Sequence, residues 1–369
     1  MSIVFAILLF SFLIFIHELG HFVAAKLSGV QVNEFAMFMG PAIFKKQFGE
    51  TLYSIRCIPI GGYCAMEGED EASDNPRAFG SAKWWKRLII LVAGSFMNFI
   101  AGLLIMVIVF MPVKQLVTPV IEGFESYSTV SGEQGLQAGD RILEVDGEKI
   151  YVQSDFGMLL SLNQGDVHDL VVERNGSKVY LNDFVMQRHE VKDEQGNTQM
   201  LYGMNFTQID ATFSDKVQYA WNNTINVIRS VRLSLQMLIS GQAGIGDMTG
   251  PVGIVQIMSD TAQASDTTLD AVLNMLYFGA FIAINLAVMN MLPIPALDGG
   301  RVVALLLTTG IEAVTRKKIN PKYEGYIHAA GMVLLLGLMA VIMFKDIFTI
   351  SPSATERRFF PASPLLFFL

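Results

Sequence analysis

Four long apolar stretches constrain the fold of this chain more than any other feature. They cover residues 3–27, 88–111, 271–292 and 327–344, and each has about the length that an α-helix needs to cross the hydrocarbon core of a bilayer. Charged residues make up only 16% of the sequence, below the fraction typical of soluble domains. We therefore predict a polytopic α-helical membrane protein with about four transmembrane helices, in contact with the lipid bilayer.

The uneven distribution of basic residues predicts the orientation of the chain. A secretory signal has a basic n-region, whereas nothing before Lys26 is basic, so we interpret the first stretch as a retained span. Lysine and arginine gather at 26–87 and 301–322, in the loops after the first and third stretches. By the positive-inside rule these loops are cytoplasmic and both chain ends lie outside. The net charge of −8 comes without a basic patch, so we expect no nucleic-acid partner.

Three neighbouring ionisable side chains interrupt the first apolar stretch, in the sequence HELGH. The i, i+4 spacing places His17 and His21 on one face of a helix, where they can share a zinc ion. Zinc lowers the pKa of a bound water toward about 7, and the adjacent Glu18 could take a proton from that water as general base. The alternative, two satisfied core histidines, would require partners for all three groups at once within a span. We predict a zinc site with Glu18 as the catalytic residue.

A zinc site of this kind needs a third protein ligand, and Asp298 in NMLPIPALDGGR is the best candidate. It follows the third stretch in a proline-rich break. The first and third stretches run in the same direction with polar residues in their C-terminal parts, so Asp298 should meet the histidines near the cytoplasmic leaflet. Asp298 could instead be the N-cap of a helix that begins at GGRVVALLL. Asn290 could donate to the substrate carbonyl or could be a helix-packing amide.

Residues 30–65 have a β-strand composition. VQVNEFAMF and TLYSIRCIPI are rich in β-branched and aromatic residues, and Gly49 lies between them in a turn sequence, QFGET. We predict a membrane-associated hairpin or small sheet. It ends at IPIGGYC, where Gly61 and Gly62 would permit close approach of another chain, so both are candidate substrate-binding residues.

The large segment between the second and third stretches is soluble in character. GLQAGDRILEVDGEKI and DLVVERNGSKVYLND each read as strands joined by a tight turn, at Asp146-Gly147 and at Asn175-Gly176. They indicate one compact β-rich domain. Residues 215–240 have apolar side chains at helical spacing, which predicts a helix that could lie on the bilayer surface or pack on the spans. A helix packed in a core is equally compatible with this pattern.

HELGH, NMLPIPALDG and GPVGI at 250–254 together resemble the site-2 protease family, in particular the bacterial RseP-type intramembrane zinc metalloproteases. The resemblance extends over about 1–346. It assigns Zn²⁺ to the positions of His17, His21 and Asp298, the general base to Glu18, and the NxxPxxxLDG asparagine to Asn290. The motif AGSFMN differs from the usual AGP-x-x-N because Ser95 stands at the proline position.

GLQAGDRILEVDGEKI resembles a single PDZ domain. The two resemblances together imply an enzyme of the bacterial cell membrane that cleaves transmembrane segments of single-span proteins already trimmed by another protease, such as anti-sigma factors or remnant signal peptides. They also imply an active site toward the cytoplasmic leaflet and an extracytoplasmic PDZ domain.

Two readings from other classes remain beside the protease, a catalytically inactive PDZ-bearing scaffold and a zinc or proton transporter. A transporter would place ionisable groups in several spans, and we expect none in the fourth stretch beyond His328 at its edge.

The expected parts are 1–112 with two spans and the β-region, 113–208 as PDZ domain, 209–269 as connecting helix, 270–346 with two spans, and 347–369 as tail.

Overall fold

The computed structural model describes residues 2–69, 71, 73–162, 165–192, 198–244, 246, 248–263, 265, 267–316 and 321–349. These residues form two compact units, one made of the chain up to Ile105 and from Ser230 onward, the other of Met106–Arg229. The expected tail at 347–369 lies outside the described residues after position 349.

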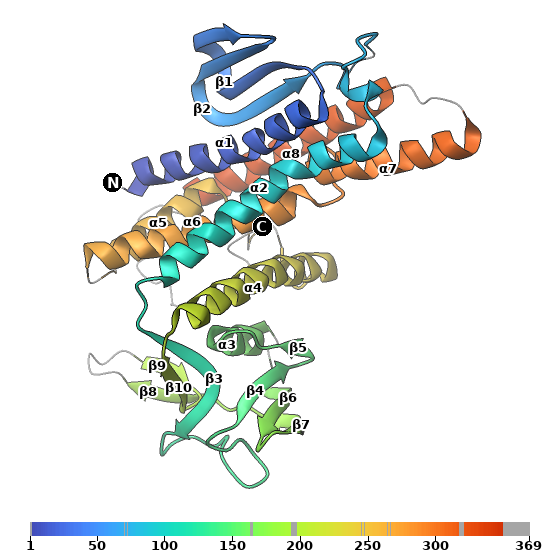
Figure 1. Cartoon of the computed structure of the whole chain (residues 1–369). Coiled ribbons are helices and arrows are strands. Elements are labelled where there is room, and N and C mark those ends of the chain that lie inside the picture. Colours follow the sequence, from blue (N-terminus) through green and yellow to red (C-terminus); the bar gives the residue numbers. More distant parts are fainter. Residues whose placement is uncertain are drawn as a thin grey trace. The chain divides into compact units, whose positions relative to one another are not determined.

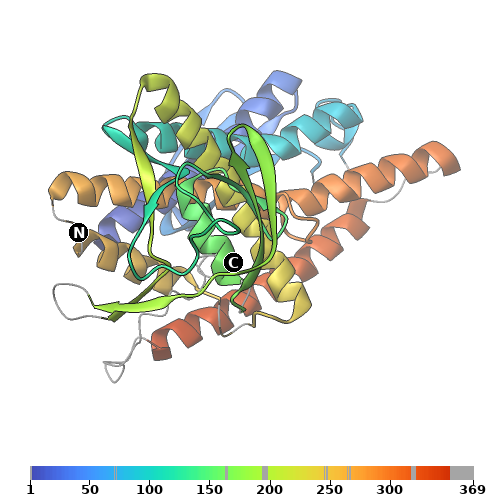
Figure 2. The same cartoon turned by 90° about the horizontal axis from the view of Figure 1, so that it is seen from below.

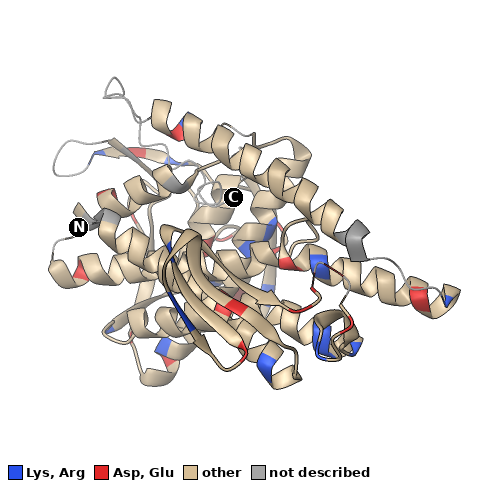
Figure 3. Cartoon of the chain, turned by 90° about the horizontal axis from the view of Figure 1, so that it is seen from above, with Lys and Arg blue, Asp and Glu red and all other residues tan. Residues whose placement is uncertain are grey.

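Four of the described helices are long and apolar enough to cross a membrane, which confirms the polytopic helical class. They are α1 (Ser2–Ser28), α2 (Trp84–Phe110), α6 (Thr268–Asn290) and α8 (Pro321–Thr349), shown in Figure 1. Lys and Arg, like Asp and Glu, are sparse along these helices in Figure 3. Two further helices, α5 (Pro251–Gln263) and α7 (Asp298–Thr315), accompany them.

The fourth span is longer than predicted and does contain ionisable residues. It reaches Phe348 and therefore includes Lys345 and Asp346, which corrects the expectation of none beyond His328. Asp346 is buried, and its Oδ2 accepts the backbone N–H groups of Gly250 and Gly253 at 2.9 and 3.0 Å. These groups lie at the start of α5, where a helix leaves its N–H groups without intrahelical partners. The carboxylate of Asp346 thus accepts hydrogen bonds from backbone N–H groups that have no acceptor within α5.

A sheet of two long strands, β1 (Val32–Phe48) and β2 (Thr51–Met66), lies beside α1, as predicted for 30–65 (Figure 1). The strands turn at Gly49 and fold back on themselves, so that residues 34–37 pair with 52–55 and also with 62–65. Phe35 packs against the rings of Phe15 and Phe22 of α1. Among the described residues, 62–66 pair only with β1 and therefore form an edge of the sheet.

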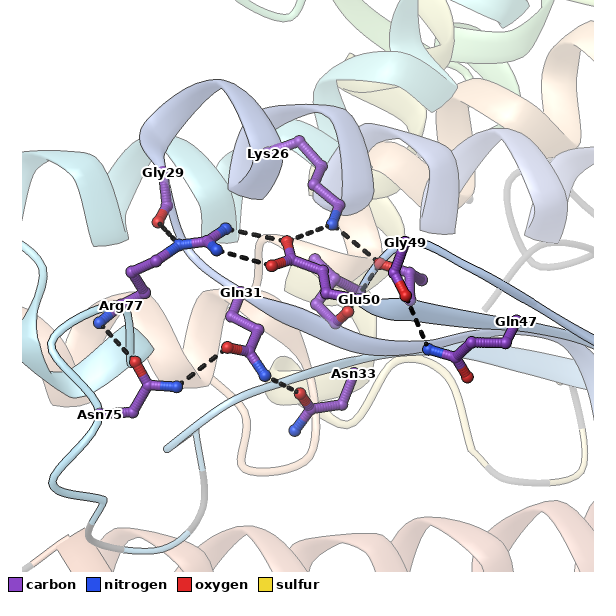
Figure 4. Close-up of polar contacts among 11 residues, drawn as sticks. Lys26, Gly29, Gln31, Asn33, Gln47, Gly49, Glu50, Asn75 and Arg77 are labelled. Carbon is purple, nitrogen blue, oxygen red and sulfur yellow. Dashed lines mark hydrogen bonds and ion pairs between the residues drawn. The ribbon is translucent and has the colours of Figure 1, made fainter.

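A polar network attaches the turn of this sheet to the end of α1 (Figure 4). Glu50 Oε1 accepts from Lys26 Nζ at 2.7 Å, and Arg77 donates to both carboxylate oxygens of Glu50, at 2.6 and 2.8 Å. Lys26 also donates to Thr51 Oγ1, and Arg77 donates to the carbonyl of Gly29. These charged hydrogen bonds hold the pKa of Glu50 at about 2 and fix the sheet relative to the helix that carries HELGH.

The Met106–Arg229 unit is the predicted β-rich domain. Its strands curve around one helix, α3 (Gln153–Leu162), as Figure 2 shows. The tight turns are confirmed: Asp146-Gly147 and Asn175-Gly176 have positive φ and each joins two antiparallel strands. The sheet order is β10 (Met204–Asp210), β3 (Gln115–Phe124), β4 (Arg141–Val145), β6 (Val167–Arg174) and β7 (Ser177–Val185); β5 (Glu148–Lys149) pairs with β4, and β8 (His189–Lys192) pairs with β9 (Thr198–Leu201).

The predicted amphipathic helix is α4 (Phe213–Ser240). Up to Arg229 it packs on the β-rich domain, which agrees with the core-packing alternative. Arg229 forms an ion pair with buried Asp155 of α3 at 2.8 Å, and Asn222 donates to the carbonyl of Tyr151 at 3.1 Å. Ala220 and Val227 of this part of α4 are buried, whereas Val217 and Trp221 are exposed.

Candidate active site

The two histidines of HELGH face one another on α1 and meet a carboxylate from α7. His17 Nε2 and His21 Nε2 are 3.2 Å apart, and each lies 3.3 Å from Asp298 Oδ2. The three potential ligand atoms lie within 4.8 Å of one another. The structure thus brings Asp298 to the two histidines, as predicted, although Asp298 follows His21 by 277 residues in the chain.

Asp298 is not the N-cap of α7. The N-cap is Leu297, which makes no side-chain cap hydrogen bond, and Asp298 is the first helical residue. The chain reaches it through the proline-rich break, where Ala296 has a φ of 82° and donates its N–H to His328 Nδ1 at 3.1 Å. His328 therefore helps to fix the loop that delivers the carboxylate.

Glu18 lies beside the edge segment of β2. The backbone N–H of Cys64 donates to its carboxylate. A Cβ atom on Gly62 would lie 3.2 Å from Glu18 Cγ, so glycine permits this close approach. Gly61 has a φ of 74° and lies against Met39. The proposed base and the two glycines therefore belong to one region of the site.

Asn290 is the last residue of α6 and is half-buried. Among the described residues, no hydrogen bond joins it to the histidines or to Asp298. Its role in orienting a substrate carbonyl stays a prediction.

One face of α2 contacts all three candidate ligands, and these contacts were not predicted from the sequence. The carbonyl of Ile90 accepts from His21 Nδ1 at 2.8 Å, and a Cβ on Gly94 would lie 2.2 Å from His21 Nε2. Ser95 Oγ donates to Asp298 Oδ2 at 3.4 Å, and the amide of Asn98 lies 3.4 Å from His17 Nδ1. The motif AGSFMN, which contains Gly94, Ser95 and Asn98, was noted only for its difference from AGP-x-x-N, and none of these residues is a typical metal ligand.

The donor set fits a zinc ion. Two imidazole nitrogens and one carboxylate oxygen form a ligand set typical of catalytic zinc, which leaves a further position for water or substrate. Because Nδ1 of His21 donates its proton in a hydrogen bond to the carbonyl of Ile90, Nε2 of His21 has a free lone pair directed toward Asp298. Membrane-spanning helices, the HExxH motif and the clustered carboxylate together define a zinc metalloprotease of the membrane.

Comparison with known proteins agrees with this class. The profile of peptidase family M50 matches residues 5–338, and the chain belongs to that family, which confirms the resemblance to site-2 proteases. A Clostridium perfringens protein, named as a candidate zinc metalloprotease, is 35% identical to this chain over 353 residues. The match covers 94% of this chain and 98% of that protein. The Bacillus subtilis regulator of sigma-W protease RasP is 27% identical over 431 residues, covering 92% and 97%.

Proposed function

We propose that this protein is an intramembrane endopeptidase that cleaves peptide bonds within, or at the edge of, transmembrane segments of single-span membrane proteins. The observation that carries the proposal is the position of the site. His17, Glu18 and His21 lie inside a helix that can span a membrane, and Glu18 contacts the edge segment of a sheet. A soluble substrate would not require a site at this place.

The side chains have distinct roles in this proposal. His17, His21 and Asp298 would hold the zinc ion, which would supply a Lewis acid for the scissile carbonyl and lower the pKa of the attacking water. Glu18 takes the proton from the attacking water and can pass it to the leaving amine. Its hydrogen bond with the backbone of Cys64 keeps its carboxylate directed to the region between α1 and β2.

The edge segment 62–66 is proposed to bind the substrate. A transmembrane helix resists cleavage because its carbonyls are hydrogen-bonded within the helix. An unwound stretch could instead pair with the free edge of β2, in the β-augmentation mode. Gly61 and Gly62 provide room at this edge, and Asn290 could orient the carbonyl that is attacked.

The orientation of the chain in the membrane determines on which side the site and the β-rich domain would lie. Basic residues at 26–87 and 301–322 favour a bacterial cell membrane orientation with the site toward the cytoplasmic leaflet. The β-rich domain would then be an extracytoplasmic PDZ domain that limits access to substrates trimmed by another protease. The name of the Bacillus subtilis relative points to a regulator of a sigma factor, so anti-sigma factors are candidate substrates, with remnant signal peptides as the second class.

The test is to map the cleaved bond. The purified protein would be reconstituted in vesicles with a tagged single-span substrate, and the products would be identified by mass spectrometry. We expect cleavage within the apolar segment or at its edge, and no product with the Glu18→Gln variant. Cleavage confined to soluble parts of the substrate, or equal cleavage by the variant, would contradict the proposal.

A further inference from the structure

Span α2 presents an outer hydrogen-bond partner to each of the three proposed zinc ligands. The carbonyl of Ile90 serves His21, Ser95 serves Asp298, and Asn98 lies next to His17. Ile90 and Asn98 are eight residues apart and Ser95 and Asn98 are three apart, spacings that bring side chains to the same side of a helix. Outer partners of this kind fix the orientation and the tautomer of metal-binding histidines.

The hydrogen bond between His21 and the carbonyl of Ile90 shows which tautomer a zinc-binding histidine needs at this site. A neutral imidazole carries its proton on one nitrogen and has a lone pair on the other. The carbonyl of Ile90 can only accept, so Nδ1 of His21 carries the proton and Nε2 is free to bind metal. His17 also directs Nε2 toward Asp298, at 3.3 Å. It therefore needs the same tautomer, with the proton on Nδ1 and an acceptor nearby.

Asn98 is the group that can provide this acceptor. Its side chain is buried, with 1% exposed, and its amide lies 3.4 Å from His17 Nδ1. The amide nitrogen faces the ring, whereas the oxygen, Oδ1, has no hydrogen-bond partner among the described residues. Buried polar atoms are nearly always paired. A side-chain amide can turn by 180° within the same space, which would exchange the two atoms.

We propose that Asn98 is the positioning residue of His17. Its Oδ1 accepts a hydrogen bond from the protonated Nδ1 of His17, which fixes the tautomer that offers Nε2 to zinc. The opposite tautomer would place a proton between Nε2 and Asp298 and leave no lone pair for a metal. This inference rests on the proposed zinc site and adds to it a residue that does not contact the metal.

The experiment compares zinc affinity among variants of the full-length protein in detergent. Asn98→Leu has a similar size but no acceptor, and we expect its zinc dissociation constant, measured by competition with a chelator, to rise by about 10–100-fold. Asn98→Asp keeps an acceptor and should bind zinc nearly as tightly as wild type. Asn274→Leu is the matched control, because Asn274 is an exposed residue of α6 that donates to Ser265; its affinity should be unchanged.

Two further readouts separate positioning from packing. The unfolding midpoint of each variant in excess chelator reports stability without metal. The visible absorption of the cobalt-substituted protein reports ligand geometry, and it should change in Asn98→Leu but not in Asn98→Asp. Asn98→Ala, which removes the acceptor without adding a branched side chain, replaces the leucine variant if that variant does not fold.

Each outcome has a definite meaning. Wild-type affinity in Asn98→Leu or Asn98→Ala would overturn the inference. Equal loss of affinity in Asn98→Asp would also overturn it, because packing rather than acceptance would then explain the effect. A wild-type protein that binds no zinc would overturn the proposed function itself, and the inference with it. Zinc bound by wild type but not weakened in the variants would leave the proposed function intact.

Discussion

The first and fourth membrane-spanning helices both bury ionisable side chains, but they satisfy them in different ways. In α1, His17 and His21 converge on the carboxylate of Asp298, so that three potential metal ligands meet. In α8, Asp346 accepts two backbone N–H groups at the start of α5. A buried charge in a span therefore indicates a functional site when other ligand-type side chains surround it, and a structural contact when backbone groups do.

The largest effect is expected when the proposed base in α1 is removed. Glu18→Gln keeps the size of the side chain but cannot take a proton, so cleavage of a single-span substrate should fall by about 10²–10⁴-fold. Zinc content, measured by atomic emission on the same samples, should stay at the wild-type value. A variant that cleaves at the wild-type rate would remove Glu18 from the mechanism.

The corresponding change in α8 should affect stability instead of metal binding. Asp346→Leu leaves the N–H groups of Gly250 and Gly253 unpaired, at a cost of about 1–3 kcal/mol for each group. The free energy of unfolding in a denaturant titration should fall accordingly, with unchanged zinc content. Asp260→Leu is the control, since Asp260 is an exposed residue of α5. Loss of zinc in Asp346→Leu with normal stability would break the comparison.

A smaller and pH-dependent effect is expected at the sheet anchor. Lys26 and Arg77 lower the pKa of Glu50 from 4.5 to about 2. A lowered folded-state pKa contributes stability that is present above pH 4.5 and is lost as pH falls toward 2. Glu50→Gln should therefore reduce stability by about 1 kcal/mol or less at pH 7 and flatten the acid limb of a stability curve. Glu71→Gln, at an exposed position, should change neither; an unchanged acid limb in Glu50→Gln would contradict the assignment.

The smallest effect concerns Ser95. Its hydrogen bond with the carboxylate of Asp298 is long, at 3.4 Å, so we expect it to contribute less than the about 1.5–3 kcal/mol of a well-formed hydrogen bond to a charged group. Ser95→Ala should weaken zinc binding by no more than about 2–10-fold, measured by chelator competition. A larger loss than that caused by Asn98→Leu would reverse the order of importance that we assign to the outer partners.

Sequence reasoning could identify the ligands because their signals are local or topological. HELGH defines one helix face by itself, and the direction of the spans places Asp298 near it. The outer partners escaped prediction for a physical reason. Ile90 contributes only its backbone carbonyl, and Asn98 has meaning only once α2 is packed against α1.

The same limit explains two other differences. Asp346 lies beyond the apolar run that defined the fourth stretch, and its partners are backbone groups of a distant helix. The two strands at 30–65 were predicted from composition, but their double pairing at 34–37 depends on register, which composition does not specify.

The most direct test of the account is the zinc content of the purified wild-type protein beside that of Asp298→Ala. We expect about one zinc per chain in wild type, removable by a chelator, and little zinc or cleavage in the variant. Equal zinc in both proteins would show that Asp298 is not a ligand. A zinc-free wild-type protein with full cleavage activity would contradict the central claim that His17, His21 and Asp298 form the metal site of a zinc protease.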